Sequence, residues 1–252
     1  MNTDDTPSEA AIRETDTPGS APSDIADPES IAKLVKRFKE GKKQMEYIRP
    51  EMMPDIDLYM DQATTFMDSH LQSTKRYPED KILTKTMINN YAKNNLLPPP
   101  FKKKYSKDHL LLLTFIYYLK NMLSMNDIQS LLEPIKAEFF QNRQSPLHLE
   151  DIYREIFTQA SDIQDDILAD ISAKFNQSRD SFSRFSFNSD TASPSGPRET
   201  SLTEETRDML QDFTFVCLLC YDIFLKKQLV EQIIDTMGQK EKIPKDSKKH
   251  KS

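Results

Sequence analysis

Two cysteines and a group of aspartates are the residues whose types and spacing first suggest chemistry. Cys217 and Cys220 form a C-x-x-C motif, a spacing used by zinc sites and by redox-active thiol pairs. Zinc would need two more ligands, but the chain has no second cysteine pair and its four histidines stand singly. We therefore interpret both cysteines as members of the apolar stripe of a helix. The aspartates have no histidine or glycine turn beside them, so a solvated acidic face is expected at Asp162, Asp165, Asp166 and Asp170.

Glycines are too few and too scattered for a phosphate-binding loop. The chain has four, Gly19, Gly41, Gly196 and Gly238, and none lies near another. Nucleotide-binding loops need clustered glycines, because backbone N–H groups must approach the anion closely. No nucleophile elbow is present either. The sequence thus predicts no enzyme and no cofactor, and its long apolar-periodic stretches favour an all-α fold.

A helix with one polar face, expected between Thr84 and Asn94, is the more informative pattern. Thr84 suits the N-cap position. By helical spacing, the inward positions are Met87, Ile88 and Tyr91. The outward positions are Thr86, Asn89, Asn90 and Lys93. A helix that is apolar behind and polar in front is what a helix-turn-helix protein places in the major groove of DNA.

The polar side chains of this helix suit the reading of bases. An asparagine can bind adenine through a paired donor and acceptor. We therefore predict that Asn89 and Asn90 read bases, with Thr86 beside them. Lys85 and Lys93 are predicted to meet phosphates.

A second basic group follows the three prolines Pro98–Pro100. We call Lys102, Lys103 and Lys104 the wing, and predict that they neutralise phosphates. Tyr105 is expected either to pack under the wing or to contact the DNA backbone.

The stretch from Ile82 to Leu132 resembles the DNA-binding domain of MerR-type regulators. In that family a recognition helix with a tyrosine near its end leads into G-L-L-x-P, a wing, Y-S-x-x-D/H-L, a helix, and x-S-L-x-E-I-x-x-L-L. The matching positions here are Tyr91, Leu96, Leu97, Pro98, Tyr105, Ser106, His109, Leu110, Ser124, Ile128, Leu131 and Leu132. The resemblance implies a winged helix-turn-helix domain that binds DNA.

Residues 50–140 also resemble a bacterial family known as domain of unknown function 1836. The similar stretches are D-L-Y-M-D-Q at 57–62, L-L-P-P-P at 96–100 and K-K-K-Y-S at 102–106. The chain departs from the MerR pattern in three places. The loop before the recognition helix is longer than a usual helix-turn-helix turn, and Asn89-Asn90 stand where MerR proteins carry an arginine. The wing of MerR proteins reads Y-R-x-Y, whereas this chain has Lys103-Lys104-Tyr105 with no arginine.

Charge is distributed unevenly over a chain whose net charge is −6. Residues 1–30 hold eight acidic residues against Arg13, whereas residues 75–107 hold nine basic residues against two acidic ones. A basic block in an acidic protein indicates a local anionic partner. The acidic start does not resemble a signal peptide, and the longest apolar run, Phe213 to Leu225, is shorter than the ~20 residues that a bilayer requires. We therefore expect a cytoplasmic protein with no membrane span.

The expected order of segments follows from apolar periodicity and from helix breakers. Within the DNA-binding domain, helices are expected at about 57–71 and 84–94, from Ser106, and from Ser124, with Pro134 kinking or restarting the last one. The segments are a disordered acidic tail at 1–28, a short basic amphipathic helix at 29–49, the MerR-like domain at 50–142, a long helix at 147–176, a flexible Ser-rich linker at 177–202, a long C-terminal helix at 203–238 and a basic disordered tail at 239–252.

Both long helices carry apolar stripes. In the first, the spacing is that of a coiled-coil seam, at Ile156, Ala160, Ile163, Ile167 and Ile171. In the second, the residues on one side are Leu210, Phe213, Cys217, Cys220, Phe224, Val230, Ile234 and Met237.

The sequence thus predicts a sequence-specific transcription regulator of MerR-like type that binds double-stranded DNA. We expect a homodimer through the C-terminal helices, because two-fold symmetry lets one protein read two half-sites. The alternative is a non-enzymatic adaptor on a helix-turn-helix scaffold that has lost DNA binding. In that case the lysines and the basic helix at 31–49 would contact an acidic protein or a membrane surface.

Overall fold

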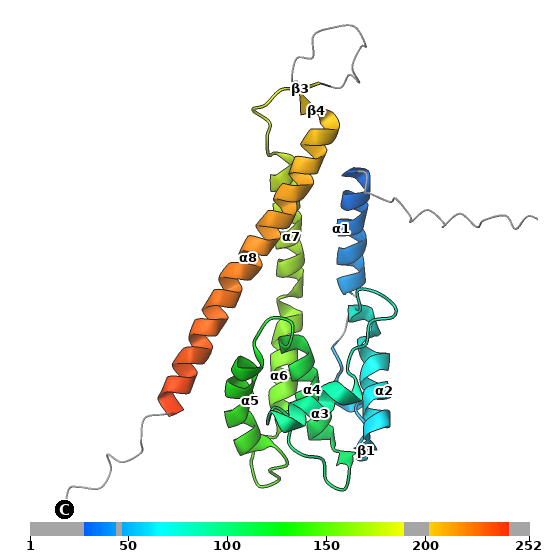
Figure 1. Cartoon of the computed structure of the whole chain (residues 1–252), viewed down its shortest axis with the longest axis vertical. Helices are drawn as coiled ribbons and strands as arrows, with labels where there is room; N and C mark the ends of the chain where they lie inside the picture. Colours follow the sequence, from blue (N-terminus) through cyan, green and yellow to red (C-terminus); the bar gives the residue numbers. More distant parts are fainter. Residues whose placement is uncertain (1–27, 44–46, 189–201, 242–252) are drawn as a thin grey trace, which may run out of the picture.

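The computed structural model describes residues 28–43, 47–188 and 202–241, and these residues are mostly helical (Figure 1). The expected all-α class is therefore confirmed at that level. Residues 1–27 and 242–252 of the expected tails, and residues 189–201 of the expected linker at 177–202, lie outside the described residues. The helices are α1 (Pro28–Lys43), α2 (Met60–Leu71), α3 (Lys85–Lys93), α4 (Lys107–Leu119), α5 (Met125–Phe139), α6 (Leu149–Asp162), α7 (Gln164–Arg179) and α8 (Glu204–Glu241), with short 3-10 turns η1 (Pro50–Met52) and η2 (Gln72–Thr74).

Two short strand pairs accompany the helices. Strand β1 (Leu58–Tyr59) pairs antiparallel with β2 (Lys104–Tyr105), with Leu58 opposite Tyr105 and Tyr59 opposite Lys104. Strand β3 (Phe187–Asn188) pairs parallel with β4 (Leu202–Thr203) and leads into α8. The first pair joins the start of α2 to the start of α4, and so it fixes the hairpin that carries the wing.

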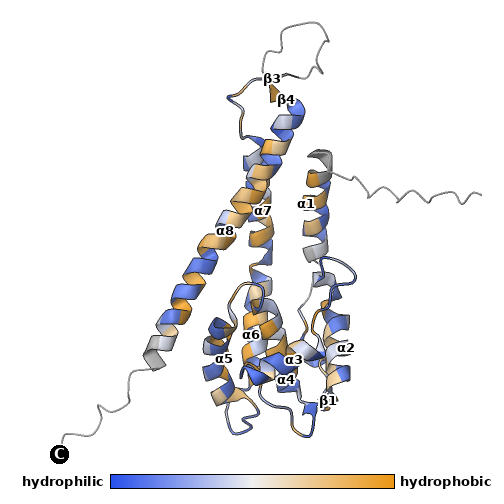
Figure 2. Cartoon of the chain, viewed as in Figure 1, coloured by the Kyte–Doolittle hydropathy of each residue, from blue (hydrophilic) through white to orange (hydrophobic). Residues whose placement is uncertain are grey.

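Helix α4 is the centre of the core. Every residue from His109 to Tyr117 is buried, because the sequence there is apolar around the whole helix rather than on one face. Helices α2, α3, α5 and α6 surround it (Figure 1), and the apolar colouring of Figure 2 is strong along α6 and around α4. Ala63 and Met67 of α2, Ile88 of α3 and Ile128 of α5 are fully buried against this centre.

Side-chain caps start the helices close to the positions expected. The Thr84 hydroxyl accepts a hydrogen bond from the Met87 N–H at 3.1 Å, as an N-cap should. Ser124 and Asp127 form the expected capping box at the start of α5. The sequence predicts that Pro134 kinks or restarts this helix. Helix α5 runs on past Pro134 as one helix, so it does not restart there.

The helix expected at 147–176 is in fact two helices. Helix α6 ends and α7 begins at Ile163. Tyr153 of α6 is held in the core, where its hydroxyl donates to the Ile48 carbonyl at 2.8 Å, whereas Phe175 of α7 packs edge-on against Phe215 of α8 at 5.3 Å. Helix α6 thus packs on the core, whereas α7 packs on α8. Three side chains of the expected seam, Ile156, Ile163 and Ile167, are exposed.

Helix α8 is a single long helix that packs antiparallel on α7 and then diverges from it towards α5 (Figure 1). Near its start, Arg179 of α7 forms an ion pair with Asp212, and the Gln211 amide donates to the Arg179 carbonyl at 2.7 Å. Near its end, Ile234 is buried in the main core. Among the described residues, no helix combines the length and the apolar character that crossing a membrane requires.

Candidate nucleic-acid interface

Helix α3 presents a polar face on an apolar support. Ile88 is fully buried and Tyr91 is only 5% exposed, so these two side chains fix the orientation of the helix on the core. Burial also raises the pKa of the Tyr91 hydroxyl above its ordinary value. The residues predicted to contact DNA from this helix all lie in the exposed class: Lys85, Thr86, Asn89, Asn90 and Lys93.

The chain leaves α3 through a left-handed residue. Asn95 has φ 57°, a conformation that asparagine tolerates better than most residues. The N–H groups of Leu96 and Leu97 both donate to the Tyr91 carbonyl, at 2.9 and 3.2 Å, and both side chains are buried. This turn directs the chain into Pro98–Pro100 and towards the wing.

The wing lysines lie on a tight hairpin. The Lys104 N–H donates to the Phe101 carbonyl at 2.9 Å, and the two residues between them, Lys102 and Lys103, have φ of 49° and 65°. Two successive positive φ angles are typical of a type I′ hairpin turn. Lys102 and Lys103 are therefore held at an exposed tip. Lys104 is half-buried, with its Nζ 5.2 Å from the centre of the Tyr59 ring.

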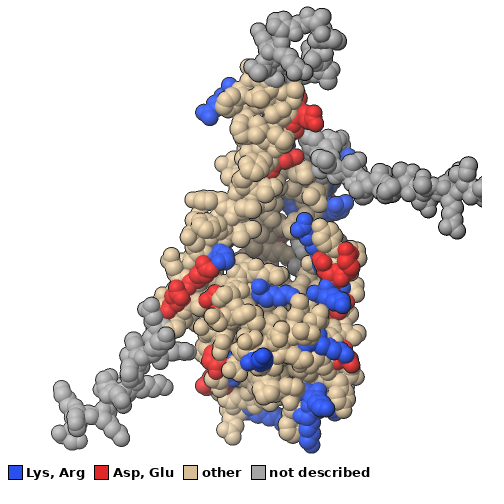
Figure 3. Space-filling view, viewed as in Figure 1, with Lys and Arg blue, Asp and Glu red and all other residues tan. Residues whose placement is uncertain are grey.

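Helix α3 and the wing meet at the start of α2. Lys85 at the start of α3 forms an ion pair with Asp61, whereas Lys104 of the wing lies over Tyr59, two residues earlier. The structure therefore brings Lys85 and Lys104, which are 19 positions apart in the sequence, to neighbouring residues at the start of α2. The lower end of the face shown in Figure 3, where Figure 1 places the β1–β2 pair, shows basic side chains.

The basic side chains of this region differ in how far they are already neutralised. Lys85 forms an ion pair with Asp61, whose side chain is 72% exposed. Within the described part of the chain, no carboxylate lies within ion-pair distance of Lys93, Lys102 or Lys103. These three ammonium groups are the ones most available to a polyanion.

Tyr105 lies in the core and not at the interface. Its side chain is 2% exposed and packs edge-on against His109 at 5.4 Å. Of the two positions expected for Tyr105, the structure shows the one under the wing. We therefore do not include Tyr105 among the residues proposed to contact DNA. The alternation along β2, with Lys104 outward and Tyr105 inward, is the sequence signal that separates the two residues.

One exposed residue of the hairpin was missed by the sequence reasoning. Phe101 is 69% exposed beside Lys102, whose Nζ lies 5.2 Å from the centre of its ring. Its place directly after three prolines, before a run of lysines, was the available signal.

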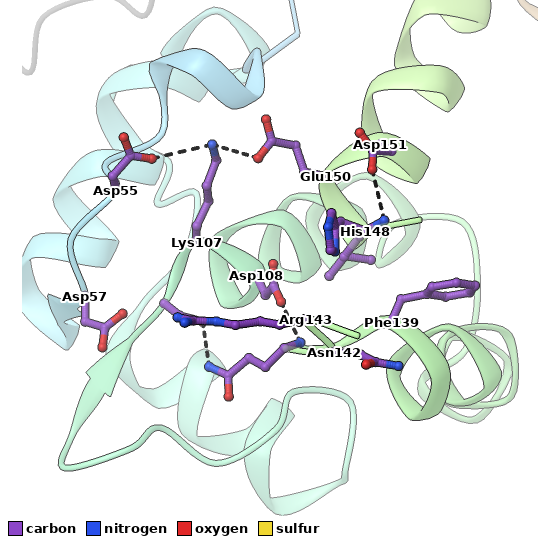
Figure 4. Close-up of a pocket in the computed structure, with 13 residues that line it drawn as sticks. Asp55, Asp57, Lys107, Asp108, Phe139, Asn142, Arg143, His148, Glu150 and Asp151 are labelled. Carbon is purple, nitrogen blue, oxygen red and sulfur yellow. Dashed lines mark hydrogen bonds and ion pairs between the residues drawn. The ribbon is translucent and has the colours of Figure 1, made fainter. Parts of the chain in front are cut away.

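A charged pocket of about 620 Å³ lies at the start of α4 (Figure 4). Lys107 sits between Glu150 at 2.9 Å and Asp55 at 3.7 Å, and the Asp108 carboxylate accepts from the Gln141 N–H at 2.7 Å. Burial raises the pKa of Asp108 above its ordinary value. Lys107, Glu150 and Asp55 are thus paired with one another, and the Asp151 carboxylate accepts from the His148 N–H at 2.9 Å. Among the described residues, no three side chains of the types that ligate metals come together as a metal site requires.

The two cysteines that first suggested chemistry lie on α8. Both are free thiols in the exposed class, and the aspartates at 162–170 are also exposed. Within the part of the chain that the structure describes, neither group belongs to a cluster of side chains that could hold a metal ion.

Comparison with known proteins gives one match. No curated protein and no solved structure matches the chain. Residues 48–156 match the model of a protein family described as a domain of unknown function, DUF1836. This range contains α2, α3, the wing, α4 and α5, but it ends within α6, so α7 and α8 lie beyond it. The match lies in the part of the chain for which a resemblance to that family was expected.

Proposed function

We propose that this protein binds double-stranded DNA sequence-specifically and acts as a cytoplasmic transcription regulator of MerR-like type. The observation that supports this best is the exposed polar face of α3 beside a hairpin tipped with lysines. In this proposal α3 enters the major groove, and the wing rests on the phosphate backbone.

The residues divide by the part of DNA that they would meet. Asn89 and Asn90 are exposed on the outer face of α3, where an amide can pair with the N6 and N7 atoms of adenine. Lys93, Lys102 and Lys103 lack competing carboxylates in the described chain and suit phosphates. Lys85 would have to exchange Asp61 for a phosphate, so we expect a smaller contribution from it.

A homodimer through the C-terminal helices completes the proposal. A two-fold pair of α3 helices would read two half-sites, and the half-site spacing would follow from the dimer. The long helix α8, which carries many exposed apolar side chains, supports this part.

A selection from a random DNA pool tests the proposal without a known target. The full chain is mixed with random duplexes, the retained duplexes are sequenced, and affinities for an enriched and a scrambled duplex are measured at two salt concentrations. We expect one motif to be enriched and to bind at least ~10³-fold more tightly than scrambled DNA, with affinity falling log-linearly with salt. A pool that stays random, with equal affinities, would contradict sequence-specific binding.

The second candidate is a protein-interaction adaptor that does not bind DNA. Phe101 is the observation that favours it, because an exposed aromatic beside Lys102 and Lys103 also fits an acidic protein surface. The same selection separates the two, since an adaptor would retain DNA weakly and without regard to sequence.

A further inference from the structure

Three short extended segments meet at the wing hairpin. Strand β2 pairs with β1 on one side, where Tyr59 lies opposite Lys104. On its other side, Lys104 lies opposite Phe101 through an antiparallel bridge across the turn. Side chains of residues that lie directly opposite each other project from the same face of a sheet. Tyr59, Lys104 and Phe101 therefore form one row, which we call the aromatic row.

The aromatic row is the outer face of these segments. Tyr59 is 54% exposed and Phe101 is 69% exposed. The residues next to the row in the two strands, Leu58 and Tyr105, are buried and face the core, as the alternation of a strand requires. Neighbouring strands lie about 4.8 Å apart, so the backbones that carry the two rings are separated by about 10 Å, with Lys104 between them.

A lysine ammonium group accompanies each ring. The Lys104 Nζ lies 5.2 Å from the centre of the Tyr59 ring, and the Lys102 Nζ lies 5.2 Å from the centre of the Phe101 ring. In the part of the chain that the structure describes, neither lysine has a carboxylate within ion-pair distance. Both positive charges are therefore available to an anion that lies beside the rings.

We propose that the aromatic row stacks on unpaired bases of a single DNA strand. In such a strand flat bases alternate with phosphates, and here two exposed rings alternate with lysines. Each ring would stack on a base, while Lys102 and Lys104 would meet the phosphates beside it. Every base has a flat face, so this contact requires no particular sequence.

The two exposed rings favour an unpaired strand over other anionic partners. In a duplex the bases are stacked on one another, so a side chain reaches their faces only where the stack is opened. The lysines alone could meet an acidic protein surface, and such a contact would give the two rings no flat partner. A ligand that is both flat and anionic accounts for the rings and the lysines together.

This inference goes beyond the proposed function, because it assigns a second form of DNA to the hairpin rather than to α3. It rests on the proposed function in one respect, the choice of DNA over RNA, since α3 reaches the start of α2 beside Tyr59. The two can fail separately. Asn89→Ala/Asn90→Ala should lose sequence preference on a duplex and keep the wild-type affinity for a single strand.

A tryptophan placed in the aromatic row reports stacking directly. The chain contains no tryptophan, so Phe101→Trp gives the full chain a single probe. This variant is titrated with a thymidine strand of about 12 nucleotides and with an abasic strand of the same length, which carries the phosphates without bases. We expect the thymidine strand to quench the fluorescence and to bind at least ~5-fold more tightly than the abasic strand. Equal binding of the two strands would mean phosphate contacts alone and would overturn the proposal.

Removal of both rings tests the row in an otherwise unchanged chain. Each ring should contribute at least ~5-fold, so Tyr59→Ala/Phe101→Ala should bind a labelled thymidine strand at least ~30-fold more weakly in fluorescence anisotropy. The conservative variant Tyr59→Phe/Phe101→Tyr keeps both rings and should keep the wild-type affinity.

The matched control is Tyr77→Ala/Phe185→Ala. It removes two rings that are 50% and 46% exposed and that also lie beside arginines, but outside the row. We expect it to bind the thymidine strand as the wild type does, and circular dichroism checks that all variants keep their helices. Equal losses in the two alanine variants would overturn the assignment to the aromatic row.

Two further ligands test the occupant. Polyglutamate offers negative charge without bases, and we expect it to displace the thymidine strand poorly. Displacement at equal charge concentration would assign the surface to an acidic protein and would overturn the proposal. A deoxyuridine and a uridine strand differ in the 2′-hydroxyl, and we expect the deoxyuridine strand to bind at least as tightly. Tighter binding of the uridine strand would overturn the choice of DNA.

Discussion

The two tip lysines of the wing allow a quantitative prediction. Lys102 and Lys103 are exposed, lack a carboxylate partner in the described chain, and sit at positive φ. The substitution that removes their charge with least strain is Lys102→Asn/Lys103→Asn, because asparagine accepts the left-handed region. Alanine would lose the charge but add backbone strain, which would confuse the result.

The magnitude follows from counterion release. Each phosphate contact contributes about −0.9 to the slope of log affinity against log salt, so losing two contacts should reduce the slope by about 1.8. Over a fourfold rise in salt, from roughly 50 to 200 mM, the wild type should therefore lose about 12-fold more affinity than the variant does. The preference for the enriched duplex over scrambled DNA should change little, because phosphate contacts carry no sequence information.

Fluorescence anisotropy with a labelled duplex at four salt concentrations measures both quantities. The matched control is Lys36→Gln/Arg37→Gln, which removes the same charge from exposed residues of α1, far from the wing in Figure 1. We expect the control to keep the wild-type slope. An equal reduction in both variants would mean that the wing has no special role and would refute the placement of the hairpin on the backbone.

Three further predictions concern folding. Ile88→Ala should lower the free energy of unfolding, measured by urea denaturation, by about 2–5 kcal/mol, because the Ile88 side chain is fully buried behind α3. Asn89→Ala should change the free energy of unfolding by no more than about 0.5 kcal/mol. Equal effects of the two substitutions would contradict the orientation of α3. Tyr153→Phe should cost about 1–3 kcal/mol, because the Ile48 carbonyl loses its buried donor, and a neutral result in the same assay would argue against that bond. Burial lowers the pKa of His109, so the unfolded state binds the proton more readily; stability should be full above the unfolded pKa of about 6.5 and should fall as the pH drops below it. His109→Gln should flatten this fall in denaturation curves at pH 5–7, and an unchanged pH dependence would assign the proton to another group.

The local structure of residues 82–132 could largely be predicted from the sequence. Thr84 and Ser124 cap helices as their residue types predicted, and Ile88 and Tyr91 are buried as helical spacing predicted. These features depend on residues within one or two helical turns. The same is true of the outward direction of Asn89 and Asn90.

The features that the sequence did not reveal depend on contacts between distant segments. The break at Ile163 arises because α6 is held by the core through Tyr153, whereas α7 is held by α8 through Phe175. The apolar periodicity of the sequence is continuous across this break, so it does not show that the two helices pack on different elements. In the same way, the sequence alone does not show which apolar side of α8 faces solvent, because this depends on how α8 packs on α7. The exposed side includes Met209 and Val216, which were not part of the stripe expected from the sequence.

The position of Tyr105 shows how a strand pairing can settle an open choice. Its pairing opposite Leu58 places its side chain on the core side, and the next residue pair places Lys104 outward. The sequence contains the alternation, but a two-residue strand is too short to be recognised from it.

The most direct test of the central claim compares Asn89→Ala/Asn90→Ala with the wild type on the enriched duplex and on scrambled DNA. The DNA-binding account predicts that the variant folds normally, loses most of its preference for the enriched duplex, at about 1–3 kcal/mol for each lost base contact, and keeps the wild-type affinity and salt slope on scrambled DNA. A variant that keeps the full sequence preference would contradict the placement of α3 in the major groove, and a wild type that binds neither duplex would contradict DNA binding itself.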